Sequence, residues 1–374
     1  MEASKRVIVS RAALVHNFEL CRRQANGAGI IALVKADAYG HGMLECARLF
    51  ADLGAAGLAV ADAVEGVALR EAGLAVPIYV LAGLAPQTVP GIVAHNLTPL
   101  VSDGAMLERL AHEAQRQKRV CTVHLKVDVG MGRQGALPED FPELTRKALS
   151  LPAIQIGGMM AHLPKAGDRN SDHSERARDA FARVSAVARA LVPYPLFCHL
   201  ASSGALFYVA DSRFDQVRPG IALYGCYPGG AAGKKSAGAP DLRPAMSWTA
   251  DILLVRQVPA GHSIGYDCTW ITKRPTKMAV LPLGYADGYL RRLSNRGQVL
   301  IAGRRAPVLG RVSMNLTVVD VTDIPGVDAG DEAVLLGRQG ADEITADELA
   351  GWMETINYEA LCLIGRLNRR VYQD

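Results

Sequence analysis

The chain has 374 residues, of which 49% are hydrophobic and 21% are charged, and its formal net charge at pH 7 is +4. These values are typical of a globular protein, and the length favours two domains. Lysine and arginine are spread along the chain rather than clustered, which argues against nucleic acid or an anionic membrane as a partner.

Targeting and redox signals point to the cytoplasm. The first ten residues contain no apolar stretch of signal-peptide length, and no later stretch approaches the roughly 18 unbroken apolar residues of a membrane helix. The 7 cysteines are scattered and none forms a Cys-x-x-Cys pair, so we expect reduced thiols and no zinc or other metal site.

The first two-thirds of the chain alternates helical patterns with short apolar runs. Ser10 is a typical N-cap residue, and apolar residues follow it at helical spacing. Eight strands are predicted at Ile30–Val34, Gly57–Val60, Ile78–Leu81, Leu97–Val101, Val120–Val127, Ile156–Ala161, Leu196–Leu200 and Gln216–Arg218. Helices are predicted at Ala61–Ala72, Gly104–Gln117 and Ser174–Leu191. This count predicts an α/β fold of the (β/α)₈ TIM barrel type, because a doubly wound sheet usually has fewer strands.

The composition changes at residues 227–244, where glycine, alanine and proline indicate a loop or linker. Short strands are predicted beyond it at Met246–Val258, Met278–Leu283, Val299–Ala302, Ala306–Leu309, Leu316–Val321 and Ala333–Leu336. One late helix is predicted, with Thr345 or Asp347 near its start. We therefore expect a barrel domain over residues 1–238 and a mainly β C-terminal domain over residues 239–374.

Lys35 ends the first predicted barrel strand and opens a turn of small residues. A lysine at the end of a buried strand commonly extends its ammonium to solvent, and that is the simplest interpretation of this residue alone. The alternative is covalent, because a desolvated lysine has a lowered pKa and can form a Schiff base. The second interpretation would make the chain a pyridoxal phosphate (PLP) enzyme.

Other polar residues are predicted at the same end of the barrel, where active sites of this fold form. Arg133, His162, Ser203 and Arg218 follow later strands. Each alone is explained by a structural role, but together with Lys35 they predict one site. Two further features suggest a phosphate site: the backbone N–H groups at Gly220 and Ile221, and the hydroxyls of Ser203 and Tyr39.

Several segments together resemble the barrel-type alanine racemases, a family of PLP-dependent amino-acid racemases. They match that family in order and spacing at residues 34–42, 126–133, 218–225, 265–266, 282–288, 310–314 and 356–359. The resemblance spans nearly the whole chain, and the segments in the second domain narrow it to racemases. It implies interconversion of L- and D-alanine, which would supply D-alanine for peptidoglycan.

The resemblance also implies a two-base mechanism, since racemisation removes a proton from one face of Cα and returns one to the other. Lys35 would serve one face and Tyr266 the other. Tyrosine ordinarily titrates near pH ~10, so Arg218 and His162 would have to stabilise its phenolate. Without the resemblance, Tyr266 is better explained as a buried tyrosine of the β domain. In the family this tyrosine and Met314 reach the lysine of the partner subunit, which implies a head-to-tail homodimer with shared sites.

The remaining roles are carried over residue by residue. Arg218 would contact the PLP ring nitrogen, and Arg133 would contact the cofactor's phenolic oxygen and the substrate carboxylate. The phosphate would be held by Tyr39, Ser203, Gly220, Ile221 and Tyr358. Met314 would line the substrate pocket. Lys126 matches a position that is carbamylated in many members, and the added carboxylate would orient Arg133.

Two positions depart from the family pattern, and three other functions stay open. Asn315 stands where aspartate is common, and Ser202 stands where asparagine is common. The first alternative is a broad-specificity or serine racemase on the same scaffold. The second is a non-catalytic PLP-binding homeostasis protein, which would be essentially a lone barrel. The third is a barrel-type decarboxylase, which would be expected to place a carboxylate where Arg218 stands.

Overall fold

The apolar runs of the first part of the chain become the strands of a closed parallel barrel in the computed structural model, which describes residues 4–168, 172–234 and 239–374. The strands are β2 (Gly29–Leu33), β3 (Gly57–Val60), β4 (Ile78–Val80), β5 (Thr98–Val101), β6 (Cys121–Lys126), β7 (Ile154–Met160), β8 (Phe197–Ser202) and β9 (Gln216–Arg218). β9 pairs with β2 and closes the ring. The predicted TIM barrel is therefore confirmed.

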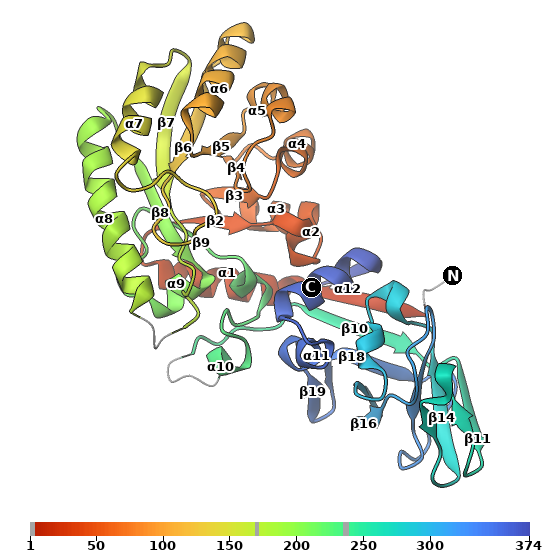
Figure 1. The fold of residues 1–374 in the computed structure, drawn as a ribbon. Coiled ribbons are helices and arrows are strands. Elements are labelled where there is room, and N and C mark those ends of the chain that lie inside the picture. Colours follow the sequence, from red (N-terminus) through yellow and green to blue (C-terminus); the bar gives the residue numbers. More distant parts are fainter. Residues whose placement is uncertain (1–3, 169–171, 235–238) are drawn as a thin grey trace.

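Helices cover the outside of the barrel and carry the chain between its strands (Figure 1). They are α1 (Arg11–Ala25), α2 (Lys35–Tyr39), α3 (Met43–Asp52), α4 (Ala63–Glu71), α5 (Val89–Ala94), α6 (Gly104–Arg116), α7 (Phe141–Ser150), α8 (His173–Leu191) and α9 (Ser203–Tyr208). Ser10 caps α1 as predicted, because its hydroxyl accepts a hydrogen bond from the Ala13 N–H at 3.1 Å. Apolar side chains fill the space between these helices and the strands in one continuous core.

The second domain is built around a mixed sheet with the order β16-β15-β18-β10-β1-β20. Its strands are β1 (Lys5–Ser10), β10 (Met246–Asp251), β15 (Gln298–Ile301), β16 (Arg304–Pro307), β18 (Glu332–Gln339) and β20 (Arg370–Gln373), and β19 (Asp342–Ile344) pairs with β18. Two smaller sheets contain β11 (Leu254–Val258), β14 (Thr276–Leu281) and β17 (Thr317–Asp320), and β12 (Ser263–Ile264) and β13 (Trp270–Ile271). The mainly β character predicted for this domain is confirmed.

The strands β1, β12, β13, β19 and β20 were not predicted, and three other details differ from the prediction. The run 246–258 is two strands in different sheets, because the chain leaves the large sheet after β10 and the Leu253 N–H bonds to Val280 in the smaller one. The single late helix is two, α11 (Ala346–Met353) and α12 (Asn357–Leu367), separated where Glu354 adopts a left-handed conformation. The linker contains a short helix, α10 (Gly230–Lys234).

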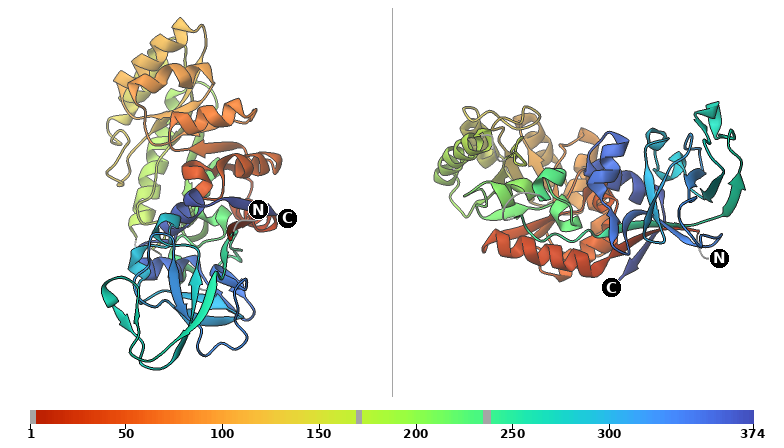
Figure 2. Two further views of the ribbon diagram at one scale, coloured as in Figure 1. Left: turned by 90° about the vertical axis from the view of Figure 1, so that its right-hand side faces the viewer. Right: turned by 90° about the horizontal axis from the view of Figure 1, so that it is seen from below.

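The chain begins in the second domain's sheet. β1 pairs with β10 in antiparallel and with β20 in parallel orientation. The predicted boundary at residue 238 lies outside the described residues, so the division into 1–238 and 239–374 stays a prediction. The barrel and the second domain form two lobes in both views of Figure 2.

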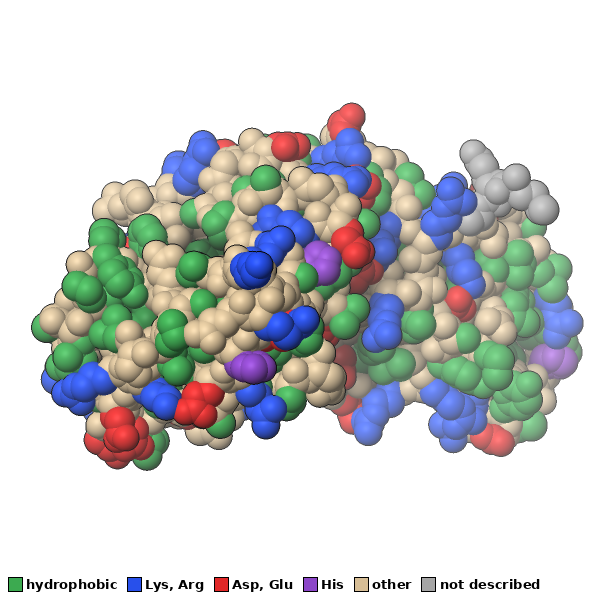
Figure 3. All heavy atoms as spheres, turned by 90° about the horizontal axis from the view of Figure 1, so that it is seen from above, with side chains coloured by type: hydrophobic (Ala, Val, Ile, Leu, Met, Phe, Trp, Pro, Cys, Tyr) green, Lys and Arg blue, Asp and Glu red, His purple; other side chains and the backbone are tan. Residues whose placement is uncertain are grey.

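The surface carries mixed charge. Figure 3 shows basic, acidic and apolar side chains interspersed over one face of the molecule. Within the described part of the chain, no helix is both long enough and apolar enough to cross a membrane.

Candidate active site

Two adjoining cavities lie at the carboxyl ends of the barrel strands. Their open volumes are about 910 and 1220 Å³, and Lys35, His162 and Arg218 line both. The first also exposes Lys126 and Arg133, and a TIM barrel places its active site at this end. The structure thus brings together residues that are far apart in the sequence, as predicted.

Lys35 follows β2 directly and begins a turn of left-handed backbone. Residues Ala36, Asp37, Ala38 and Tyr39 have φ angles of 52°, 55°, 54° and 54°. For residues other than glycine this conformation costs roughly 1–2 kcal/mol each. α2 is therefore one left-handed turn and not an ordinary helix, and it fixes the direction in which the chain leaves Lys35.

A carboxylate beside Lys35 ties two strand ends together. Glu65 accepts a hydrogen bond from the Ala36 N–H at 2.7 Å and another from the Ala61 N–H, also at 2.7 Å. Burial lowers the pKa of Lys35, and the Arg133 cation lowers it further, whereas Glu65 acts in the opposite direction. The net effect favours the neutral amine, which is the form that can act as a nucleophile or a base.

The first cavity is strongly cationic. The described residues that line it include Lys35, Lys126, Arg133 and Arg218 but no aspartate or glutamate. Lys126 Nζ donates to Gln134 Oε1 at 2.9 Å. Burial, followed by the Arg133 and Arg218 cations, lowers the pKa of Lys126 to about 8. Such a cavity favours ligands with phosphate, carboxylate or phenolate groups.

Arg218 ends β9 and is only 2% exposed. Its NH1 donates to His199 Nδ1 at 2.9 Å and to the His199 carbonyl at 2.6 Å, and its NH2 donates to the carbonyls of Ala161 and Leu200 at 2.7 and 3.0 Å. All four acceptors are neutral groups. Burial lowers the pKa of Arg218 to about 9, so the guanidinium remains charged at neutral pH.

His162 follows β7 and faces the same cations. Burial lowers the pKa of His162 to about 3, with further contributions from Arg218 and Arg133. The imidazole is therefore neutral at physiological pH, and the positive field at this position comes from the two arginines and, to a smaller extent, from Lys35 and Lys126.

The second cavity contains the residues predicted to hold a phosphate. Tyr39, Ser203, Gly220, Ile221 and Tyr358 all line it. Ser203 Oγ accepts a hydrogen bond from the Gly220 N–H at 2.8 Å, so the hydroxyl and the backbone amide are adjacent. A side chain at Gly220 would collide with the Tyr39 hydroxyl, which explains the glycine.

The two second-domain residues lie elsewhere in the single chain. Tyr266 is 66% exposed and Met314 is 55% exposed, and neither is among the described residues that line the two cavities. Asn315 is also exposed, whereas Ser202 lines both cavities. One chain therefore supplies the predicted barrel residues but not the predicted second base.

Several residues of the site were not singled out from the sequence. Inside the barrel, His124 Nδ1 lies 2.7 Å from His199 Nε2, which connects the pair to Arg218. The pair of glycines in β7 makes room for this ring, since a Cβ at Gly158 would collide with His124. Gln134 and Glu65 were not predicted either. The only signal was the glycine pair within an apolar strand, which indicates a close approach.

Comparison with known proteins gives the family. The model described as "Alanine racemase, N-terminal domain" matches residues 9–228, and "Alanine racemase, C-terminal domain" matches residues 245–372. The chain belongs to the alanine racemase family. It is accordingly an enzyme of the isomerase class, an amino-acid racemase.

Individual relatives agree over nearly the full length. The alanine racemase of Syntrophobacter fumaroxidans is 40% identical over 365 residues, which are 96% of this chain and 95% of the relative. The crystal structure of alanine racemase from Streptomyces lavendulae superposes with a TM-score of 0.93 at 33% identity and covers 100% of this chain and 98% of that one. A structure from Bartonella henselae, described as having covalently bound pyridoxal phosphate, has a TM-score of 0.88 at 28% identity, with 100% of both chains covered.

Proposed function

We propose that the protein interconverts L- and D-alanine with PLP as cofactor and works as a homodimer with shared sites. The observation that carries this proposal is a lysine with a lowered pKa in a cavity rich in cations and free of carboxylates among its described lining residues. D-alanine made in this way would serve peptidoglycan synthesis in the cytoplasm.

The residues present fit PLP. The cofactor has a phosphate and a phenolic oxygen, and the substrate brings a carboxylate, so the bound pair supplies the negative charge that the cavity lacks. Tyr39, Ser203, Gly220, Ile221 and Tyr358 would hold the phosphate. Arg218, which is buried and charged, would donate to the ring nitrogen and leave it unprotonated. When bound, PLP delocalises the electron pair that proton removal leaves at Cα.

Two groups of the protein would move the proton. Lys35 would hold PLP and, with the substrate bound, its Nζ would exchange a proton on one face of Cα. Tyr266 Oη of the partner subunit exchanges a proton on the other face. Arg133 would fix the substrate carboxylate so that Cα lies between these two atoms. The large exposed fractions of Tyr266 and Met314 agree with a place in a subunit interface.

Lys126 has the chemistry needed for carbamylation. Carbon dioxide reacts with a neutral amine, and a pKa of about 8 leaves a useful neutral fraction at pH 7. The product would carry a carboxylate and would remove one of the four cationic charges of the cavity. It would also give Arg133 an anionic partner that holds its side chain in place.

The proposal is tested by a racemisation assay with L- and D-alanine, with and without added PLP, and with serine, lysine and arginine as competing substrates. We expect alanine to turn over fastest and PLP to be required. A preference for a basic amino acid or for serine would replace alanine in the proposal. A dimer that binds PLP but racemises none of these amino acids would instead indicate a non-catalytic PLP-binding protein.

A further inference from the structure

The left-handed turn after Lys35 cannot be held by its own small side chains. Ala36 and Ala38 offer only methyl groups, and their φ angles of 52° and 54° are uncommon for alanine. Backbone hydrogen bonds close the turn, from the Ala38 N–H to the Val34 carbonyl at 2.8 Å and from the Gly40 N–H to the Ala36 carbonyl at 3.2 Å, and contacts with neighbouring elements add to them. Its first and last residues, Lys35 and Tyr39, are both predicted cofactor ligands, so the shape of the turn decides how these two side chains are spaced.

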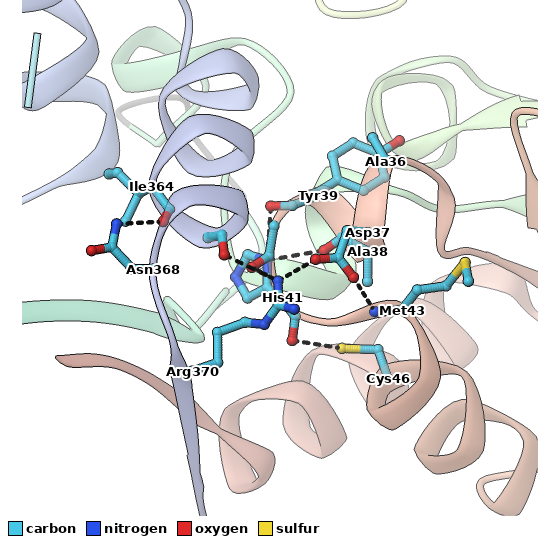
Figure 4. A network of polar contacts seen from close by, with 12 residues as sticks. Ala36, Asp37, Ala38, Tyr39, His41, Met43, Cys46, Ile364, Asn368 and Arg370 are labelled. Carbon is cyan, nitrogen blue, oxygen red and sulfur yellow. Dashed lines mark hydrogen bonds and ion pairs between the residues drawn. The ribbon is translucent and has the colours of Figure 1, made fainter. Parts of the chain in front are cut away.

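Asp37 is the acidic residue within the turn, and both of its carboxylate oxygens are engaged (Figure 4). Oδ1 accepts a hydrogen bond from the Met43 N–H at 2.7 Å, at the start of α3. Oδ2 forms an ion pair with Arg370 NH1. The Asp37 carbonyl also accepts from the Gly42 N–H at 2.9 Å, so the turn is fixed to the chain that follows it.

Arg370 belongs to β20, the edge strand of the second domain's large sheet. The same NH1 donates to the carbonyl of Gly40 at 3.2 Å and to that of Gly365 at 3.1 Å. Two residues further along β20, the Tyr372 hydroxyl donates to the His41 carbonyl at 3.0 Å. Strand β20 thus bonds to the carbonyls of Gly40 and His41 at the end of the turn and to the Asp37 carboxylate within it.

The end of the turn and helix α12 are in close backbone contact. A Cβ on Gly365 would collide with the Gly40 carbonyl, so the backbone of α12 touches the turn directly. The side chains of Asp37 and Arg370 are 35% and 23% exposed, which leaves the ion pair partly shielded from water. α12 also carries Tyr358, a predicted phosphate ligand.

We propose that Asp37 and Arg370 are positioning residues for Lys35 and Tyr39, and that the second domain sets the geometry of the barrel site through this ion pair. Without it, the turn keeps its backbone hydrogen bonds and the Glu65 contact but loses its charged anchor to β20, so it moves more freely and Lys35 and Tyr39 are held less firmly relative to each other. The inference rests on the proposed function in so far as these two residues bind PLP. Neither Asp37 nor Arg370 lines the two cavities among the described residues, so both act through the turn.

The test uses the full-length variants Asp37→Asn, Arg370→Met, Arg370→Lys and the double variant Asp37→Asn/Arg370→Met. Arg369→Met is the matched control, since Arg369 precedes Arg370 but its side chain is exposed. The dissociation constant of PLP is measured by absorbance titration of the PLP-free protein. Amide hydrogen exchange of residues 36–42 is measured without PLP, so this readout does not depend on activity or on cofactor binding.

We expect Asp37→Asn and Arg370→Met, which each remove one partner of the ion pair, to weaken PLP binding about tenfold and to speed amide exchange at residues 36–42. The double variant should show no larger effect than either single variant. Arg370→Lys should lie nearer to wild type than Arg370→Met, and Arg369→Met should match wild type. The proposal is overturned if PLP affinity and exchange stay at wild-type values, or if only thermal stability falls. A wild-type protein that binds PLP without racemising alanine would refute the proposed function and leave this test intact.

Discussion

Three buried histidines should make the protein sensitive to mild acid. His41, His124 and His199 are at most 2% exposed. Burial lowers the pKa of His41 to about 4 and that of His124 to about 3, and it lowers the pKa of His199 well below the ordinary value. In the folded protein these rings therefore stay neutral at pH 5, whereas in the unfolded chain they take up protons below pH ~6.5.

The direction in which pH changes the stability follows from the number of protons that each state binds. Because the unfolded state binds more protons, the stabilising contribution is fully present above pH ~6.5 and is lost as the pH falls toward the folded-state pKa values. At pH 5 His41 and His124 each cost about 2 kcal/mol relative to neutral pH, or roughly 4 kcal/mol together, and His199 adds to the loss in the same direction. This loss is comparable to the total stability of a typical domain, about 5–15 kcal/mol. Aspartate and glutamate remain largely ionised at pH 5, so they contribute little to the change.

The assay is urea unfolding at pH 7 and pH 5, at one fixed protein concentration. The change in unfolding free energy between the two pH values should shrink by about 2 kcal/mol in His124→Gln. His112 is exposed, so His112→Gln should leave the change as it is in wild type. An equal pH effect in wild type and His124→Gln would refute the reasoning, as would a wild-type change below about 1 kcal/mol.

Three further outcomes are expected. Lys35→Ala should fold but lack the visible absorbance of bound PLP, which is checked by spectrophotometry. Gly220→Ala should bind PLP about tenfold more weakly by titration, because the added methyl group collides with the Tyr39 hydroxyl. Removal of dissolved carbon dioxide should lower wild-type activity, and bicarbonate should restore it, whereas Lys126→Gln should respond to neither.

The barrel was predictable because its strands are short apolar runs that alternate with helical patterns. The positions of Lys35, Arg133, His162, Ser203 and Arg218 at one end followed from that topology alone. Their roles did not, since each side chain has a common structural explanation. Specific chemistry came only from the resemblance, and the structure then added the lowered pKa of Lys35 and the excess of positive charge around it.

The remaining features depend on tertiary contacts that have no local signal. Nothing about Ala36 or Ala38 indicates a left-handed backbone, because alanine normally favours the opposite hand. The pairing of β1 with β20 joins the two ends of the chain, and the hydrophobic pattern of a strand does not indicate which strand it pairs with. Tyr266 gave no signal of its own, and its side chain is 66% exposed in the single chain, away from Lys35.

The most direct test of the central claim mixes equal amounts of two variants that we expect to be inactive, Lys35→Ala and Tyr266→Phe, under conditions in which subunits exchange. In a two-fold dimer with shared sites, half of the dimers are mixed, and each mixed dimer has one intact site and one site with both lesions. We therefore predict recovery of about a quarter of the wild-type racemase activity. Subunits that exchange but recover no activity above the separate variants would contradict the assignment of Lys35 and Tyr266 to one site formed by two subunits.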